Sequence, residues 1–192
     1  MTALDTYLQF ILDYAPHFYY IPASGVDLTF GRGVAAASFS IDFLYEAYNS
    51  GKCDSQKTSI YNKVVSLADW VLTQQCVNNA KDAYGGFRSN ETSTFYYSID
   101  ACRVVPSLLK VYELTSDSDY LDAAVLAGKT FLKTMQDKQA HGGFARFVDI
   151  NDVWDLKLDV ECLYGLIGLK MLCNYDSDAK SQYETMMETA VD

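Results

Sequence analysis

Two aspartates stand at matching places in a repeated stretch of the sequence. Asp100 in YSIDAC and Asp159 in LKLDVEC each follow a Gly-Gly-Phe turn, which reads YGGFRSN the first time and HGGFARF the second. Two carboxylates that face each other across a cleft can act as general acid and general base if burial or mutual repulsion raises one pKa. Asp100 and Asp159 are therefore the candidate catalytic residues. The alternative is structural, because the first turn of a helix stabilises a lone carboxylate.

Arginine and aromatic residues surround the same turns. A guanidinium group binds carboxylate or phosphate through paired hydrogen bonds, and it also forms salt bridges within a protein. Aromatic rings stack against ligands or fill the core. The candidate ligand-binding residues are Arg88, Arg146, Tyr97, Phe87 and Trp154.

An acidic stretch, DINDVWDLKLDVE, places Asp149, Asp152, Asp155 and Asp159 close together. A calcium or magnesium site is one interpretation, and a loop with helix-capping aspartates is the other. The second interpretation is the more common one for such a stretch. With only two histidines in the chain, we predict no metal site and no cofactor.

The segments that must position these residues carry apolar residues at helical spacing. YYSIDACRVVPSLLKVYEL and TSDSDYLDAAVLAGKTFLKTMQ each carry a broad apolar stripe at helical spacing. Gly85 recurs as Gly142, 57 positions on, and Asp100 recurs as Asp159, 59 positions on. We predict an all-α single domain over residues 1–192, with repeats at about 28–66, 67–126 and 127–192 and about seven helices in antiparallel hairpins.

The composition narrows the class of partner. A formal charge of −10 argues against nucleic acid or an anionic membrane as the main partner. The first residues, MTALDTYLQFILDYAP, lack the basic leader and the cleavage site of a signal peptide. Five cysteines without C-x-x-C spacing favour free thiols, so we expect a cytoplasmic protein.

The hairpin pattern resembles a known fold family. Tyr97, Asp100 and Arg103, followed by LLKVYELTSDSDYLDAAVLAGKTFL, look like the hairpins of α/α-toroid proteins, above all the six-hairpin glycosidases, polysaccharide lyases and sugar epimerases. The resemblance covers roughly residues 28 to 175 as a pattern. It implies a partial α/α toroid whose glycine-aromatic loops line a sugar-binding cleft.

Three functions remain open on this resemblance. The first is a carbohydrate-active enzyme or carbohydrate-binding domain, with a sugar or another small molecule as ligand. The second is an isoprenoid-handling protein like the prenyltransferases and terpene cyclases, whose repeats also carry Gly-Gly-Phe loops. The third is a noncatalytic helical-repeat interaction module. Closed toroids need more hairpins than this chain supplies, so a homodimer that closes the arc is also expected.

Overall fold

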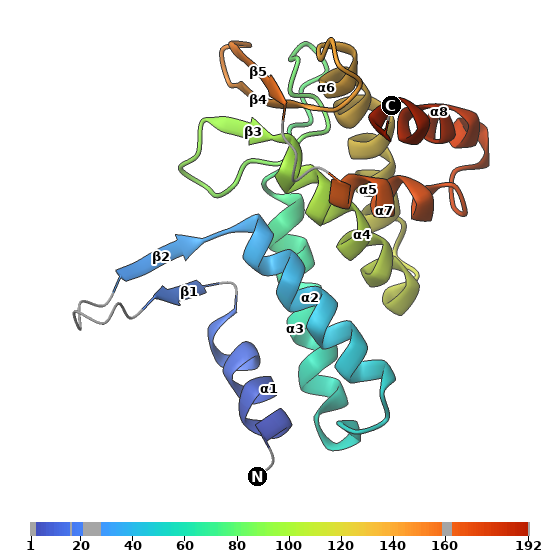
Figure 1. The fold of residues 1–192 in the computed structure, drawn as a ribbon. Coiled ribbons are helices and arrows are strands. Elements are labelled where there is room, and N and C mark those ends of the chain that lie inside the picture. Colours follow the sequence, from blue (N-terminus) through green and yellow to red (C-terminus); the bar gives the residue numbers. More distant parts are fainter. Residues whose placement is uncertain (1–2, 16, 21–27, 159–162, 192) are drawn as a thin grey trace.

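Helices form most of the molecule. The computed structural model describes residues 3–15, 17–20, 28–158 and 163–191 (Figure 1). The helices agree with the apolar periodicity and confirm the expected mostly helical class. In chain order they are α1 (Ala3–Tyr14), α2 (Val34–Asn49), α3 (Lys57–Leu72), α4 (Ser98–Thr115), α5 (Ser118–Leu126), α6 (Lys133–Asp137), α7 (Leu163–Leu172) and α8 (Lys180–Val191). A π-helical segment, η2 (Ala127–Leu132), joins α5 to α6.

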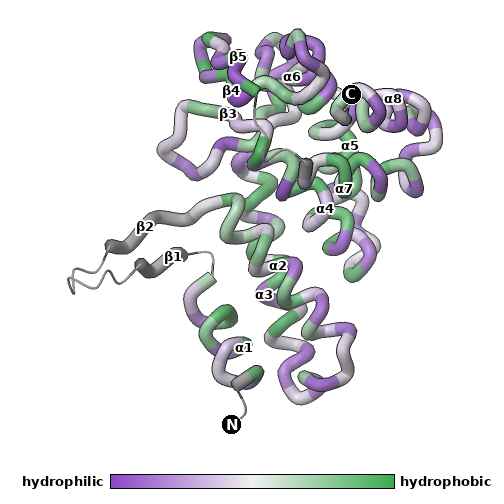
Figure 2. Tube along the Cα trace, viewed as in Figure 1, coloured by the Kyte–Doolittle hydropathy of each residue, from purple (hydrophilic) through white to green (hydrophobic). Residues whose placement is uncertain are grey.

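The helices α2 to α8 lie in two layers. Helices α2, α4 and α7 are neighbours in the first layer, and α3, the α5–η2–α6 rod and α8 make up the second. Each first-layer helix is followed in the chain by a second-layer helix that packs against it. Hydrophobic residues run along the lengths of α2, α4 and α7, as Figure 2 shows, because these helices contact neighbours on more than one side.

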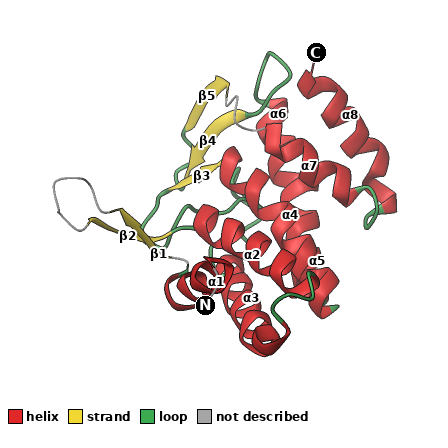
Figure 3. Ribbon diagram, turned by 60° about the horizontal axis from the view of Figure 1, so that its bottom comes forward, coloured by secondary structure: helices red, strands yellow, loops and turns green. Residues whose placement is uncertain are grey.

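Short strands accompany the helices, so the prediction that helices are the only regular elements was wrong. β1 (His17–Tyr20) pairs antiparallel with β2 (Leu28–Arg32), and β3 (Phe95–Tyr97), β4 (Ala145–Asp149) and β5 (Trp154–Leu158) form an antiparallel sheet in the order β3-β4-β5. Both sheets lie on one side of the helical body (Figure 3). The acidic stretch that begins at Asp149 therefore continues as a β-hairpin and not as a helix.

The two Gly-Gly-Phe turns make the same contacts in successive repeats. Gly85 and Gly142 have positive φ angles of 88° and 85°. A Cβ atom on Gly85 would lie 2.8 Å from the carbonyl oxygen of Leu126, and one on Gly142 would lie 2.2 Å from that of Thr189. Only glycine fits such a conformation and such an approach. Each turn therefore rests directly on the backbone of the following second-layer helix.

A glutamine side chain fastens each turn in place. The Gln75 amide nitrogen donates to the carbonyl oxygens of Gly85 at 3.0 Å and Ala123 at 2.9 Å. The Gln136 amide nitrogen donates to the carbonyl oxygens of Gly142 at 2.9 Å and Met186 at 2.8 Å. We call these two arrangements the glutamine clamps. Each clamp ties the end of one second-layer helix to its turn and to the next second-layer helix.

A buried phenylalanine side chain anchors each of these turns to the hydrophobic core. Phe87 and Phe144, the third residue of each turn, are 0% and 2% exposed. Burying a phenylalanine side chain stabilises a fold by about 1.5–3 kcal/mol. The turn and the core beneath it therefore form as one unit.

Small residues let α7 approach its neighbours closely. A Cβ atom on Gly165 would lie 2.5 Å from the Cys102 sulfur, and one on Gly168 would lie 3.0 Å from Val105. Gly128 in η2 gives the same clearance to Leu172, at 2.3 Å. These glycines leave room for α7 between α4 and η2.

Two tyrosines share one carboxylate among the three first-layer helices. The hydroxyl groups of Tyr45 and Tyr175 both donate to the Glu113 carboxylate. The bond to Glu113, followed by burial, raises the pKa of Tyr45 to about 12. Burial and then the same carboxylate raise the pKa of Tyr175 to about 12. This tyrosine–glutamate cluster links α2, α4 and the segment that follows α7.

Replacing a clamp glutamine is expected to destabilise the protein. Gln75→Leu or Gln136→Leu removes two hydrogen bonds and strands two carbonyl oxygens, so we expect the free energy of unfolding to fall by about 1–3 kcal/mol. The matched control is Gln74→Leu, because the buried Gln74 amide donates only to the adjacent Thr73 within the described residues. Urea unfolding of the three variants measures the difference. Equal losses for Gln74→Leu and Gln75→Leu would contradict the clamp.

Alkaline pH is expected to weaken the tyrosine–glutamate cluster. Between about pH 10 and pH 12, Tyr45 and Tyr175 stay protonated in the folded chain but lose their protons in the unfolded chain, where the pKa of a tyrosine is near 10. Their contribution to stability is therefore complete below about pH 10 and is lost as the pH rises through about 12. Urea unfolding between about pH 8 and pH 11 should show a steeper decline for the wild type than for Tyr45→Phe/Tyr175→Phe. Tyr112→Phe is the control that leaves both bonds to Glu113 intact.

Candidate functional site

The candidate site lies at the end of the first layer where its helices begin, which we call the rim. β2 leads into α2, β3 leads into α4, and the β4–β5 hairpin precedes α7. The segment after the first Gly-Gly-Phe turn connects two of these helix starts. The Val34 N–H donates to the Ser89 carbonyl oxygen at 2.9 Å, and the Ser89 hydroxyl donates to Asp100 at 2.5 Å.

Asp100 is a buried carboxylate in the first turn of α4. Its exposed fraction is 6%. The Ser89 hydroxyl donates to this carboxylate, which stands in the first helical turn, where acidic side chains are common. Asp159, its predicted partner, lies outside the described residues. The acid/base pair therefore stays a prediction, and the observed geometry gives Asp100 a structural role that joins α4 to the rim.

Three aromatic rings meet on one face of the β3–β4–β5 sheet. The ring centroids of Phe95 and Phe147 are 4.8 Å apart, and those of Tyr97 and Phe147 are 5.3 Å apart. All three rings are partly exposed to solvent. We call Phe95, Tyr97 and Phe147 the aromatic platform. Tyr96 and Val148, which alternate with the platform along β3 and β4, are 8% and 0% exposed. The sheet therefore has a core side and a solvent side.

A loose ion pair neighbours the platform. Arg146 precedes Phe147 in β4, and Asp155 is the register partner of Phe147 in β5. The Arg146 guanidinium lies 3.4 Å from the Asp155 carboxylate, and 49% of the arginine side chain is exposed. Donors and acceptors for a polar ligand therefore stand next to the apolar ring faces.

The other predicted binding residues take different positions. Phe87 is fully buried in the core, away from solvent. The Arg88 backbone donates to the Gln74 carbonyl oxygen, and its side chain is partly exposed. The Trp154 indole N–H donates to Asp82 at 2.8 Å, and the Lys138 ammonium lies 5.2 Å from the Trp154 ring centre. Of the predicted set, Tyr97 and Arg146 come together at the sheet.

Phe95 and Asp155 were absent from the predicted ligand-binding residues, whereas Phe147 was one of several aromatic residues considered for stacking. Alternation along FYY, with Phe95 and Tyr97 on one face and Tyr96 on the other, is the signal that could have identified the first of them. The sequence offers no local sign that β4 pairs with β3 and brings Phe147 beside them.

The aspartates of the acidic stretch hold the hairpin together. Asp149 accepts hydrogen bonds from the N–H groups of Asn151 and Val153, both at 2.8 Å. Asp152 pairs with Lys81 at 3.0 Å, and this bond lowers the pKa of Asp152. Among the described residues, no group of three or more histidine, cysteine or acidic side chains is arranged to hold a metal ion. Asp149 therefore closes the turn of the β4–β5 hairpin, and Asp152 ties that turn to the loop that holds Lys81 and Asp82.

No protein-family profile matches the sequence, and no curated protein is similar to it. Within the described ranges, no helix has the length and apolarity needed to cross a bilayer.

Two substitutions at the rim are expected to differ in their effect on stability. Ser89→Ala removes a hydrogen bond to a buried carboxylate, so we expect a loss of about 1–3 kcal/mol in the free energy of unfolding. Arg146→Ala removes one exposed ion pair, which should cost no more than about 1 kcal/mol. Chemical denaturation of the two variants tests this ranking. A larger loss for Arg146→Ala would show that the loose pair is structural.

Proposed function

We propose that this chain is a carbohydrate-binding domain and that the aromatic platform stacks against a sugar ring. The observation that carries this proposal is the group of three mutually contacting, partly exposed rings on the solvent side of the β3–β4–β5 sheet. A sugar ring presents an apolar C–H face and a polar edge. The platform supplies the complementary apolar surface, and Arg146 and Asp155 supply hydrogen-bonding groups beside it.

The charge of the chain favours a sugar over a nucleic-acid base. Nucleic acids also stack on exposed aromatic rings, but those sites combine the rings with a positively charged groove. This chain carries a formal charge of −10, and Arg146 is already neutralised by Asp155. A neutral or weakly charged saccharide fits such surroundings.

The succession of helical hairpins supports a partial α/α toroid as the setting for this site. In this proposal the first layer lines the inside of the arc and the rim carries the ligand. Hydrolysis, elimination or epimerisation would further require a second carboxylate opposite Asp100, the role we propose for Asp159. Binding through the platform does not depend on that carboxylate.

An interaction module is the second candidate function, and one observation favours it. Tyr164 and Ile167 on α7, the last helix of the first layer, are 53% and 55% exposed. Large apolar side chains on an end helix suit contact with another chain. A second copy that closes the arc is the partner we propose for this surface.

The cysteines suit a reducing compartment. Cys53, Cys76, Cys102 and Cys173 carry free thiols, and Cys162 lies outside the described residues. Buried free thiols persist in the cytoplasm, where disulfides are rare. We therefore propose a cytoplasmic location.

Substitutions in the platform are expected to weaken sugar binding. Tyr97→Ala and Phe147→Ala each remove a stacking surface, and we expect an affinity loss of about tenfold, which corresponds to one aromatic contact of about 1.4 kcal/mol. A glycan array with the wild type identifies the ligand, and isothermal titration measures each variant.

Tyr7→Ala is the matched control, because it removes an exposed tyrosine from α1, which lies at the opposite end of the molecule from the β3–β4–β5 sheet (Figure 1). Circular dichroism verifies that each variant is folded. The proposal fails if the wild type binds no glycan, or if folded Tyr97→Ala and Phe147→Ala bind as tightly as the wild type.

A further inference from the structure

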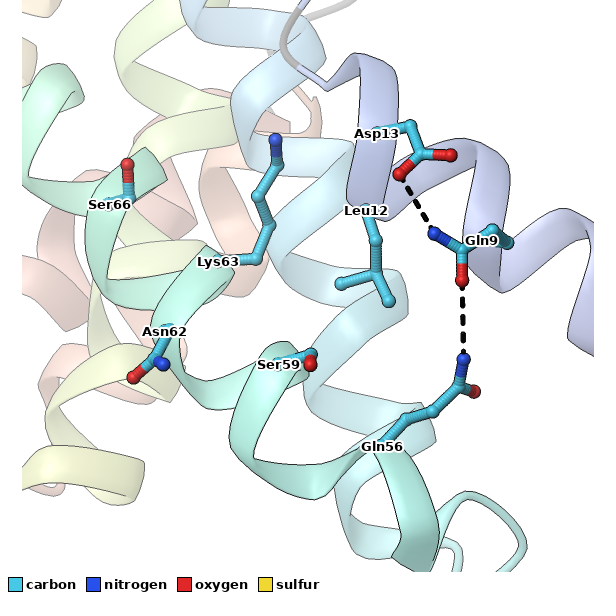
Figure 4. A pocket seen from close by; sticks show the side chains of 8 residues that line it. All are labelled: Gln9, Leu12, Asp13, Gln56, Ser59, Asn62, Lys63 and Ser66. Atoms are coloured by element: carbon cyan, nitrogen blue, oxygen red, sulfur yellow. Dashed lines mark hydrogen bonds between the residues drawn. The ribbon is translucent and has the colours of Figure 1, made fainter.

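A polar groove separates α1 from α3, in a part of the molecule distinct from the aromatic platform. It has a volume of about 410 Å³. Figure 4 shows the side chains that line it, which come from α1, η1 (Asp54–Gln56) and α3. They are Gln9, Leu12, Asp13, Gln56, Ser59, Asn62, Lys63 and Ser66. Seven of these eight side chains are polar, although grooves between packed helices usually close through apolar contacts.

One end of the groove is held in a defined shape. The Gln9 amide nitrogen donates to the Asp13 carboxylate at 2.8 Å, and its amide oxygen accepts from the Gln56 amide nitrogen at 3.5 Å (Figure 4). Gln9 is thereby oriented by one bond within α1 and one bond across to η1. The side chain of Leu12 points from α1 toward α3 and offers an apolar surface between these polar groups.

The α3 wall carries three exposed polar side chains. Ser59, Asn62 and Ser66 are spaced by three and four residues, so they follow one face of the helix. Their side chains make no hydrogen bond within the described part of the chain. The two hydroxyl groups and the amide offer both donors and acceptors to a ligand.

The groove also has little net charge. Lys63 and Asp13 contribute one charge of each sign, and the other lining residues are neutral. A strongly ionic ligand would lack a counter-charge there. A ring with several hydroxyl groups matches mixed donors and acceptors along its edge, and its C–H face matches Leu12.

We propose that the groove between α1 and α3 is a second saccharide site, which takes a neutral sugar. This inference rests on the proposed function in one respect, the carbohydrate class of the ligand. It uses different residues from different elements, so the two sites can be tested separately. Two sites on one chain would let a long glycan gain affinity by binding to both.

Nuclear magnetic resonance titration of the full ¹⁵N-labelled chain tests the second site. The probes are glucose, galactose, N-acetylglucosamine and their β-1,4-linked tetramers. We expect saturable shifts of the amide signals of Gln9, Asn62 and Ser66 with one of these probes. In Asn62→Leu/Ser66→Ala, which removes two ligand-binding groups from an exposed helix face, the groove affinity should fall about tenfold or more.

The matched control is Thr58→Ala, an exposed position on α3 that does not line the groove. It should bind as the wild type does, and thermal unfolding monitors the fold of both variants. Groove shifts that persist in folded Asn62→Leu/Ser66→Ala overturn the inference.

The pattern of shifts separates the two proposals. Shifts at the platform alone overturn the second site and leave the proposed function standing. Shifts at the groove alone overturn the platform and support the second site. A chain in which neither region responds to any probe binds no neutral sugar, and the second site is then excluded.

Discussion

The architecture depends on the contact between a glycine turn and the backbone of the next helix. Gly85 and Gly142 bring their turns within van der Waals distance of a helix carbonyl, and a glutamine bonds to both partners. This contact sets the spacing between second-layer helices. It also determines where the chain leaves each turn, and hence where α4 and the β4–β5 hairpin begin. The contacts of the turns with the second-layer helices therefore help to determine the position of the aromatic platform.

Some residues of the candidate site are held by burial and hydrogen bonds, and others are half exposed. Asp100 is buried and bonded to Ser89, so the start of α4 is rigidly connected to the rim. The platform rings lie on a short sheet whose other face is packed against the core. Arg146, in contrast, is half exposed and pairs with Asp155, which also accepts a hydrogen bond from the Lys157 N–H. The sugar that we propose as ligand would meet a fixed apolar surface and, at Arg146, an adjustable polar edge.

The sequence predicted what depends on long periodic patterns. Helical stripes predicted the helices, and the repeat of Gly85 at Gly142 identified turns that the structure shows in equivalent contacts. The strands were missed because they span three to five residues, too few for alternation to exceed chance. Phe87 and Phe147 also show what pattern cannot decide. Both are aromatic residues close to a Gly-Gly turn, yet only the tertiary fold determines that one is buried and the other exposed.

Along the chain, the residues that form the glutamine clamps are separate from the strands that carry the aromatic platform. Each clamp is completed by its turn, whereas β3, β4 and β5 occur after a turn and before the next first-layer helix. The partly exposed side chains Phe95, Tyr97 and Phe147 on these strands take no part in the clamp contacts. Under the proposed function, exchanges of these side chains would change the ligand preference while the two helical layers stay the same.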